Sequence, residues 1–233
     1  MTDGMNIPEK VSAYLAGVKG EHNREYSWMR CYKYFHERDP DAIKADCDHA
    51  ALHLGFYLAS WGMYRGSGFL LQYAYTIHLG VIDCLLDPKF SPLWDQEFGA
   101  TESDATLIPL ILRACADVRA VYAPFGKAKY ILVTDLLVTK VILGTLGCLP
   151  AIDEYFVKGF RHSGLRVSDP INPNFIQQVL WFCRNNLITF KAEQGRIEDA
   201  CGVHYPLMKL VDMYFHQVGV ESTPSQVRET KAG

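Results

Sequence analysis

Two side chains suited to charge chemistry, Lys140 and Asp153, flank a short break between two predicted helices. The break is expected at Gly147 to Pro150, after an apolar helix at 130–146 that contains Gly144, and Pro150 precedes the aspartate. A carboxylate in the first turn of a helix meets the positive end of the helix dipole and stays ionised. An ionised carboxylate, a neighbouring lysine and free N–H groups at a helix start together predict a site that binds and stabilises charge.

The helix predicted to follow Asp153 carries Lys158 and Arg161 on nearby faces. The run Pro150-Ala-Ile-Asp153 with this basic, glycine-containing helix resembles the segment that carries the catalytic aspartate in the helix-hairpin-helix DNA glycosylase superfamily, which includes the 8-oxoguanine glycosylase fold. In that superfamily the aspartate stabilises positive charge on the sugar as the base leaves. In some members a lysine attacks the sugar carbon and forms a Schiff base. The resemblance implies these roles for Asp153 and Lys140.

The same resemblance implies an all-α, two-lobed protein that flips a base of duplex DNA into a cleft between its lobes and needs neither cofactor nor metal. One lobe would combine residues 1–100 with 169–220, and the other would span 101–168. The alternative is a noncatalytic helical interaction protein. In that case Asp153 only caps its helix, and Lys140 extends from a core helix with its amine at the edge.

A second candidate stretch is Trp61-Gly-Met-Tyr64-Arg65-Gly-Ser-Gly. The glycines permit close approach of the backbone, and the planar guanidinium of Arg65 can hold a phosphate or a carboxylate. Trp61 and Tyr64 offer rings on which a base can stack. The pattern predicts an anion or nucleotide contact, and the alternative is an interhelix turn whose arginine pairs with a structural carboxylate.

A possible metal site is suggested by Asp46, His49 and His53, which fall at i, i+3 and i+7 on one side of a predicted helix. Histidines one helical turn apart can share a metal when a further ligand comes from elsewhere, and His78 is a conceivable partner. The acid of an HExxH motif is missing, because Leu52 precedes His53. The alternative is a polar edge of a helix–helix interface, and the prediction for the protein is no metal.

An arginine and a histidine on one predicted helix, Arg30 and His36, resemble the catalytic motif of the HEPN ribonucleases, which are also all-α. In that family the histidine acts as acid or base and the arginine stabilises charge on the phosphorane. Cys31 replaces the polar residue usual after the arginine. The alternatives are therefore a HEPN-like ribonuclease or an amphipathic surface helix.

Helical periodicity runs through most of the chain and strand alternation is almost absent, which predicts an all-α, orthogonal multi-helix bundle. The clearest apolar stripe recurs at three- and four-residue steps from Ile43 to Trp61. Pro124-Phe125-Gly126 is expected to separate two helices. The last strong helices are expected at 175–191 and 205–218.

The composition is that of an ordinary globular protein, because 49% of the 233 residues are hydrophobic and 21% are charged. The formal charge of -3 excludes a globally basic nucleic-acid binder, although not a local basic patch. We expect one domain over residues 1–220 and a polar tail at 221–233.

The seven cysteines favour buried free thiols, because their number is odd and no Cys-x-x-Cys pair occurs. Free thiols indicate a reducing compartment, and we expect a cytoplasmic protein. No apolar core typical of a signal peptide occurs in Met1 to Lys10. The apolar stretch from Tyr130 to Ile152 contains Asp135 and Lys140, so a buried helix is expected rather than a membrane span.

Overall fold

The computed structural model describes residues 6–18, 20, 22–66, 68–94, 104–128, 131–167 and 171–223. Within these ranges the chain is helical and contains no β-strand. The predicted all-α, multi-helix fold is therefore confirmed. Most of the predicted polar tail, residues 224–233, lies outside the described residues.

The α-helices vary widely in length, and short 3-10 helices connect some of them. In chain order the elements are α1 (Ile7–Gly17), α2 (Glu25–His36), α3 (Pro40–Ala45), α4 (Cys47–Ser60), η1 (Phe69–Gln72), η2 (Tyr75–His78), α5 (Leu79–Leu85), η3 (Pro88–Trp94), α6 (Asp104–Lys127), α7 (Asp135–Gly144), α8 (Glu154–His162), α9 (Pro173–Asn185), α10 (Leu187–Cys201) and α11 (Leu207–Glu221).

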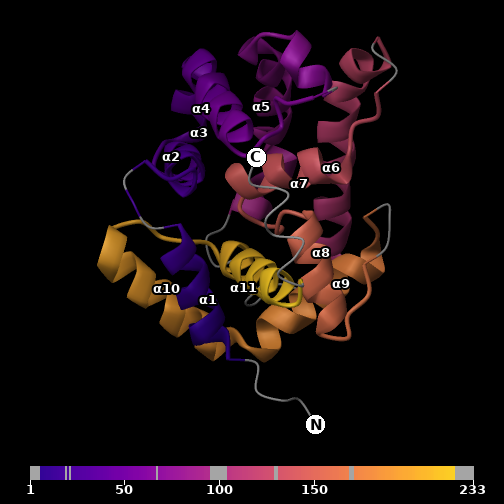
Figure 1. Ribbon diagram of the computed structural model, residues 1–233. Coiled ribbons are helices and arrows are strands. Elements are labelled where there is room, and N and C mark those ends of the chain that lie inside the picture. The colour runs from indigo at the N-terminus through magenta and orange to yellow at the C-terminus, as the bar shows by residue number, and fades with distance from the viewer. Residues whose placement is uncertain are drawn as a thin grey trace.

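The helices pack in two groups that do not follow the order of the chain (Figure 1). Helix α1 packs against α10 and α11, and α8 and α9 complete this first group. Helices α2 to α7 form the second group, in which α4 contacts α2, α5 and α7. The groups are joined where α6 contacts α9 and where the chain passes from α7 to α8. The α7–α8 connection therefore lies at the boundary between the groups.

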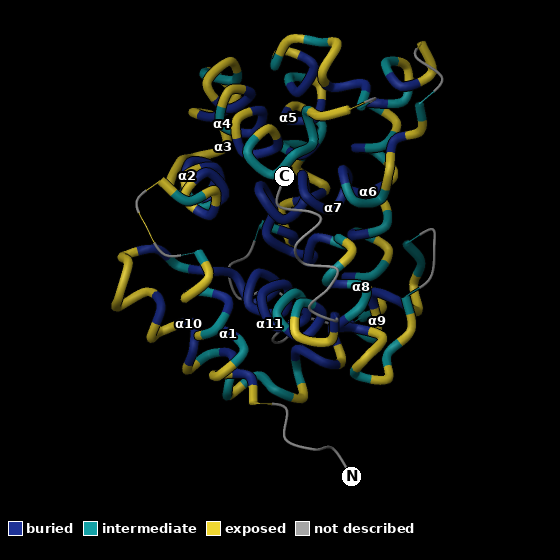
Figure 2. The backbone as a smooth tube through the Cα atoms, viewed as in Figure 1, coloured by how far each residue is buried: buried dark blue, intermediate teal, exposed yellow. Residues whose placement is uncertain are grey.

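Helices α7 and α11 are the most completely buried elements (Figure 2). Both are rich in aliphatic residues, so burying them on several faces removes much apolar surface from water. Each nevertheless carries buried ionisable groups: Lys140 on α7, and Lys209 and Asp212 on α11. A charge is costly to bury unless it has a partner, so these residues indicate a built polar site inside the core.

Helices α8 and α11 cross in direct backbone contact because each has a glycine at the crossing. A Cβ on Gly159 would collide with the carbonyl oxygen of Phe215, and a Cβ on Gly219 would collide with that of Tyr155. Aromatic rings fill the space beside the crossing, with the Phe160 and Phe215 centroids 4.9 Å apart. This close crossing fixes the start of α8 against α11.

Several helix boundaries differ from the sequence-based expectation. The helix expected from Ile43 to Trp61 is interrupted at Asp46, whose φ of -122° and ψ of 40° leave the helical region. Helix α6 continues through Pro124, contrary to expectation: the proline removes its own N–H from the helix, but its carbonyl still accepts the Ala128 N–H. The helix expected at 175–191 ends at Asn185, and α10 is an additional helix beyond it.

The described helices include none that is both long and apolar enough to cross a membrane. All seven cysteines are free thiols, and Cys31, Cys115, Cys148 and Cys183 are buried. The expectation of unpaired cysteines is therefore confirmed.

Candidate functional site

A small cavity lies where the two groups of helices meet. About 10 Å³ is available to the centre of a water molecule, which is room for about one water. The side chains around it come from α4, α7, α11 and the α7–α8 connection. They are Tyr57, Trp61, Lys140, Leu143, Ala151, Asp153, Lys209 and Asp212.

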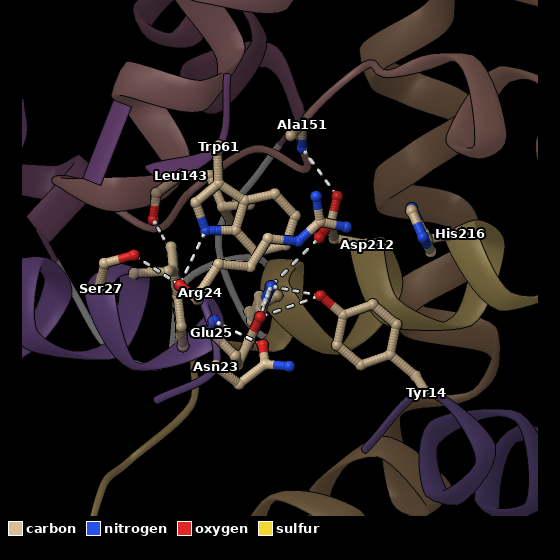
Figure 3. Close-up of polar contacts among 12 residues, drawn as sticks. Tyr14, Asn23, Arg24, Glu25, Ser27, Trp61, Leu143, Ala151, Asp212 and His216 are labelled. Atoms are coloured by element: carbon tan, nitrogen blue, oxygen red, sulfur yellow. Dashed lines mark hydrogen bonds and ion pairs between the residues drawn. The ribbon is translucent and has the colours of Figure 1, made fainter. Parts of the chain in front are cut away.

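Lys209 is a fully buried ammonium held by several partners, among them Tyr14, Glu25 and Asp212, which Figure 3 labels. Its Nζ lies 3.1 Å from Oε1 of Glu25 and 3.4 Å from Oδ2 of Asp212. It also donates to the hydroxyl of Tyr14 at 3.3 Å. The indole of Trp28 faces the same nitrogen, with its centroid 4.6 Å away. These contacts balance the buried charge and use up the donors of Lys209.

Lys140 is buried to a similar degree but lacks ionic partners. Its side chain is 4% exposed, and its Nζ lies 4.5 Å from the centroid of the Trp61 ring. Among the described residues, no carboxylate forms an ion pair with this nitrogen and no hydrogen bond to it is seen. Burial lowers the pKa of Lys140, and the charges of Lys209 and Arg24 lower it further, against the opposing effect of Asp153 and Asp212. A buried amine with a lowered pKa is a candidate nucleophile.

Asp153 is the N-cap of α8 and borders the same cavity. Its Oδ1 accepts the N–H of Phe156 at 2.8 Å, and its Oδ2 lies 3.3 Å from Nδ1 of His216. Burial alone would raise the pKa of this carboxyl. The hydrogen bond and charge of His216, then Lys140 and the Phe156 N–H, outweigh burial and lower the pKa to about 2. Asp153 is therefore ionised at neutral pH.

The α7–α8 connection brings Asp153 back toward Lys140. Gly147 has a φ of 69°, in the left-handed region that favours glycine. The Ala151 N–H then donates to Oδ1 of Asp212 at 3.1 Å, and the Ile152 N–H donates to Oγ1 of Thr139 at 3.0 Å. These bonds attach the connection to both α11 and α7, which places the start of α8 at the cavity.

Trp61 forms another wall of the cavity and is surrounded by cations. Its Nε1 donates to the Arg24 carbonyl at 3.1 Å, and the Arg24 guanidinium lies 4.5 Å from its ring centroid. Figure 3 shows the Arg24 side chain extended across the indole. The Trp61 ring therefore contacts an exposed cation, Arg24, as well as the buried Lys140.

The remaining predicted site residues lie elsewhere. Tyr64 is half-buried, and its hydroxyl lies 2.7 Å from Nε2 of His78. Arg65 is exposed and borders a separate, mainly apolar groove of about 170 Å³ beside residues 131–137. Lys158 pairs with Glu154 at 2.9 Å, and Arg161 is exposed in the last turn of α8. Of the predicted residues, the structure brings together Lys140, Asp153 and Trp61.

The Arg30 and His36 side chains point to different sides of α2, because six helical steps of about 100° separate them. Arg30 is exposed, whereas Nε2 of His36 lies 2.7 Å from the Thr145 carbonyl. Burial lowers the pKa of His36 to about 4, so its ring is neutral at neutral pH. This arrangement does not form a shared acid–base site.

The histidines considered for a metal have other partners. Nδ1 of His49 lies 2.8 Å from Oδ1 of Asp46, and the ring of His53 stacks on Tyr34 at 4.3 Å. His78 is buried, and its two ring nitrogens lie 2.7 Å and 2.6 Å from the hydroxyls of Tyr64 and Tyr122. Within the part of the chain that the structure describes, no group of three His, Cys, Asp or Glu side chains is arranged to hold a metal ion.

Sequence reasoning missed the charged residues that surround Lys140. Lys209, Asp212 and His216 fall at i, i+3 and i+7 of a helix that is otherwise mainly apolar, and this spacing places them on one face. Charged residues inside an apolar helix are the sequence feature from which this part of the site could have been predicted. Glu25 gave no such signal, because 184 residues separate it from Lys209.

Comparisons of this chain with protein-family models, with curated proteins and with solved structures found no match. The chemistry of the site is therefore argued from its own residues. An uncommitted amine, an ionised carboxylate and an aromatic wall around one cavity suit covalent attack on an electrophilic carbon with stabilisation of positive charge.

Proposed function

We propose that this protein binds duplex DNA and releases a base from it, in the manner of helix-hairpin-helix glycosylases that use a lysine. The observation that carries the proposal is that the amine of Lys140, which has no ionic partner among the residues that the structure describes, shares a cavity with the ionised carboxylate of Asp153. Two groups of helices flank this cavity, but they divide the chain differently from the lobes that the resemblance implies: α2 to α5 pack with α6 and α7, and α8 packs with α11.

In the proposed reaction, the neutral amine of Lys140 attacks C1′ of a nucleotide. The bond from C1′ to the base breaks, and its electron pair leaves with the base, which takes up the proton lost by the amine. Asp153 stabilises the positive charge that develops on the sugar. Opening of the C1′–O4′ bond, with a proton from water added to O4′, then leaves a protonated Schiff base on Lys140.

The cavity must open before a base can enter, because it has room for about one water molecule. Arg24 is the side chain that we expect to move, since it is exposed and lies over the Trp61 ring. A base could then stack on Trp61 in place of the guanidinium. The exposed Arg65 and Arg161, with Lys158, would contact phosphates, which supply most of the affinity for DNA.

A direct test uses short duplexes that each carry one oxidised, alkylated or deaminated base. Released bases are identified by mass spectrometry for the wild-type protein and for Asp153→Asn, with Asp39→Asn as the control. Asp39 also caps a helix, α3, but is exposed and distant in sequence from the site. We expect Asp153→Asn to reduce release by about 100-fold or more, and Asp39→Asn to have no effect. Absence of release from every duplex would contradict the proposal.

One contact favours a second candidate role, that of a noncatalytic helical interaction protein. The carboxylate of Asp153 already accepts the Phe156 N–H, as a purely structural cap would. In this role the buried charges only join α1, α2 and α11. The base-release experiment distinguishes the two roles. If the protein is noncatalytic, the wild type releases no base, and Asp153→Asn changes only the stability of the fold.

A further inference from the structure

Two buried lysines line the cavity, and they differ in their partners. Both nitrogens face the ring of Trp61, at 4.5 Å for Lys140 and 5.3 Å for Lys209. Lys209 has the ionic partners Glu25 and Asp212, and Lys140 has none among the described residues. Both lysines lie at the same cavity, so the positions of the carboxylates must explain why only Lys209 is paired.

We propose that Lys209 is a positioning residue for Lys140, because it engages the carboxylates of Asp212 and Glu25 and so leaves the amine of Lys140 free to react. The inference rests on the proposed function only for the identity of the substrate that this amine attacks. Lys209 itself is not the nucleophile in this arrangement, since its nitrogen is held by Tyr14 as well as by both carboxylates.

Each carboxylate that acts on Lys140 already has two partners. Asp212 accepts the Ala151 N–H through Oδ1 and pairs with Lys209 through Oδ2. Asp153, at the start of α8, accepts the Phe156 N–H through Oδ1 and lies beside His216 through Oδ2. These partners hold both carboxylates in place, and among the described residues neither forms an ion pair with Lys140.

The other groups facing Lys140 do not supply an anion. Arg24, just before α2, adds a positive charge. From α4 come Tyr57 and Trp61, and burial raises the pKa of Tyr57 well above its ordinary value, so its hydroxyl stays neutral. Burial also lowers the pKa of Lys140. Loss of Lys209 would leave Asp212, which lines the same cavity, without its cation, and Lys140 would then take it as a partner and hold its proton.

The test measures the pKa of Lys140 in the free protein, with no DNA present. Protein labelled with ¹³C at lysine Cε is titrated by NMR, and the Lys140 signal is assigned by its loss in Lys140→Met. In Lys209→Met we expect the pKa of Lys140 to rise by about one unit or more. The control is Lys44→Met, which removes an exposed lysine on α3 and should leave the Lys140 titration unchanged. An unchanged pKa in folded Lys209→Met would overturn the inference.

Asp212→Asn is the second variant, and it tests the inference if Lys209→Met does not fold. Asparagine can still accept the Ala151 N–H but removes the anion that Lys209 holds. We expect the pKa of Lys140 to fall below its wild-type value, and an unchanged pKa would overturn the inference. Because these titrations need no substrate, their result is independent of the base-release assay that tests the proposed function.

Discussion

Asp153 and His216 meet at the junction of α8 and α11, with 3.3 Å between Oδ2 and Nδ1. The carboxylate is thus held on one side by its own helix, through the Phe156 N–H, and on the other by the neighbouring helix. Both contacts favour the ionised form. The glycine crossing of α8 and α11 keeps the two residues at this distance, so packing and charge at the site are linked.

Replacing Asp153 should separate its capping role from its charge. Asp153→Asn keeps an N-cap acceptor but loses the charge, and we expect the variant to fold with a loss of about 2 kcal/mol in the free energy of unfolding at pH 7. Asp153→Ala loses both and should cost about 1 kcal/mol more. Urea unfolding measures both values. The exposed cap variant Asp39→Asn should change stability by less than about 0.5 kcal/mol, and equal losses at the two sites would contradict a special role for this charge.

The contribution of Asp153 should depend on pH in the acid range. Its pKa is about 2 in the folded protein, below the value of about 3.9 for an unfolded chain. The stabilisation is therefore fully present above about pH 4 and is lost as the pH falls toward 2. We expect the stability difference between wild type and Asp153→Asn to shrink over this interval in urea unfolding series. A difference that stays constant from pH 5 to about pH 2 would show that the charge is not stabilised by folding.

The two buried lysines should respond oppositely to replacement by methionine. Lys209→Met leaves Glu25 and Asp212 buried without their cation, which should cost about 3 to 5 kcal/mol. Lys140→Met removes a buried amine that has no ionic partner in the described part of the chain, and it should leave the free energy of unfolding equal or greater. Denaturant unfolding at pH 7 compares them, with the exposed Lys44→Met as control. A large loss of stability in Lys140→Met would mean that Lys140 is a structural ammonium.

The α8–α11 crossing should not tolerate a side chain at its glycines. Gly159→Ala places a methyl group against the carbonyl oxygen of Phe215, and we expect a loss of at least about 3 kcal/mol, because the helices must separate. Gly195 is the matched control, since it is exposed on α10 and a Cβ there meets no atom within 4 Å. Gly195→Ala should stabilise the protein by about 0.5 to 1 kcal/mol. Similar melting behaviour of the two variants would rule out the close crossing.

The all-α fold could be predicted from the sequence because periodicity is a local property that each segment shows by itself. The proximity of Lys140 and Asp153 could also be expected, since a short connection joins their helices. Boundaries were less predictable. Asp46 interrupts a continuous apolar stripe, and nothing in the spacing of that stripe reveals a one-residue break.

The rest of the site depends on contacts between distant parts of the chain. Glu25 reaches Lys209 only because α1 and the start of α2 pack beside α11, an arrangement set by the whole core. Arg65 was expected beside Trp61, but its turn directs it to the groove near residues 131–137. A residue's neighbour in sequence can thus lie on another surface, which spacing alone does not show.

Borohydride trapping tests most directly whether Lys140 is an amine nucleophile. An abasic site in duplex DNA presents an aldehyde, which condenses with an amine to an imine and water, and hydride from borohydride reduces the imine to a stable bond. We expect wild-type protein to form a covalent adduct that peptide mapping places on Lys140, Lys140→Met to form none, and Lys44→Met to match wild type. An equal yield of adduct from Lys140→Met, or no adduct from the wild-type protein, would contradict this account.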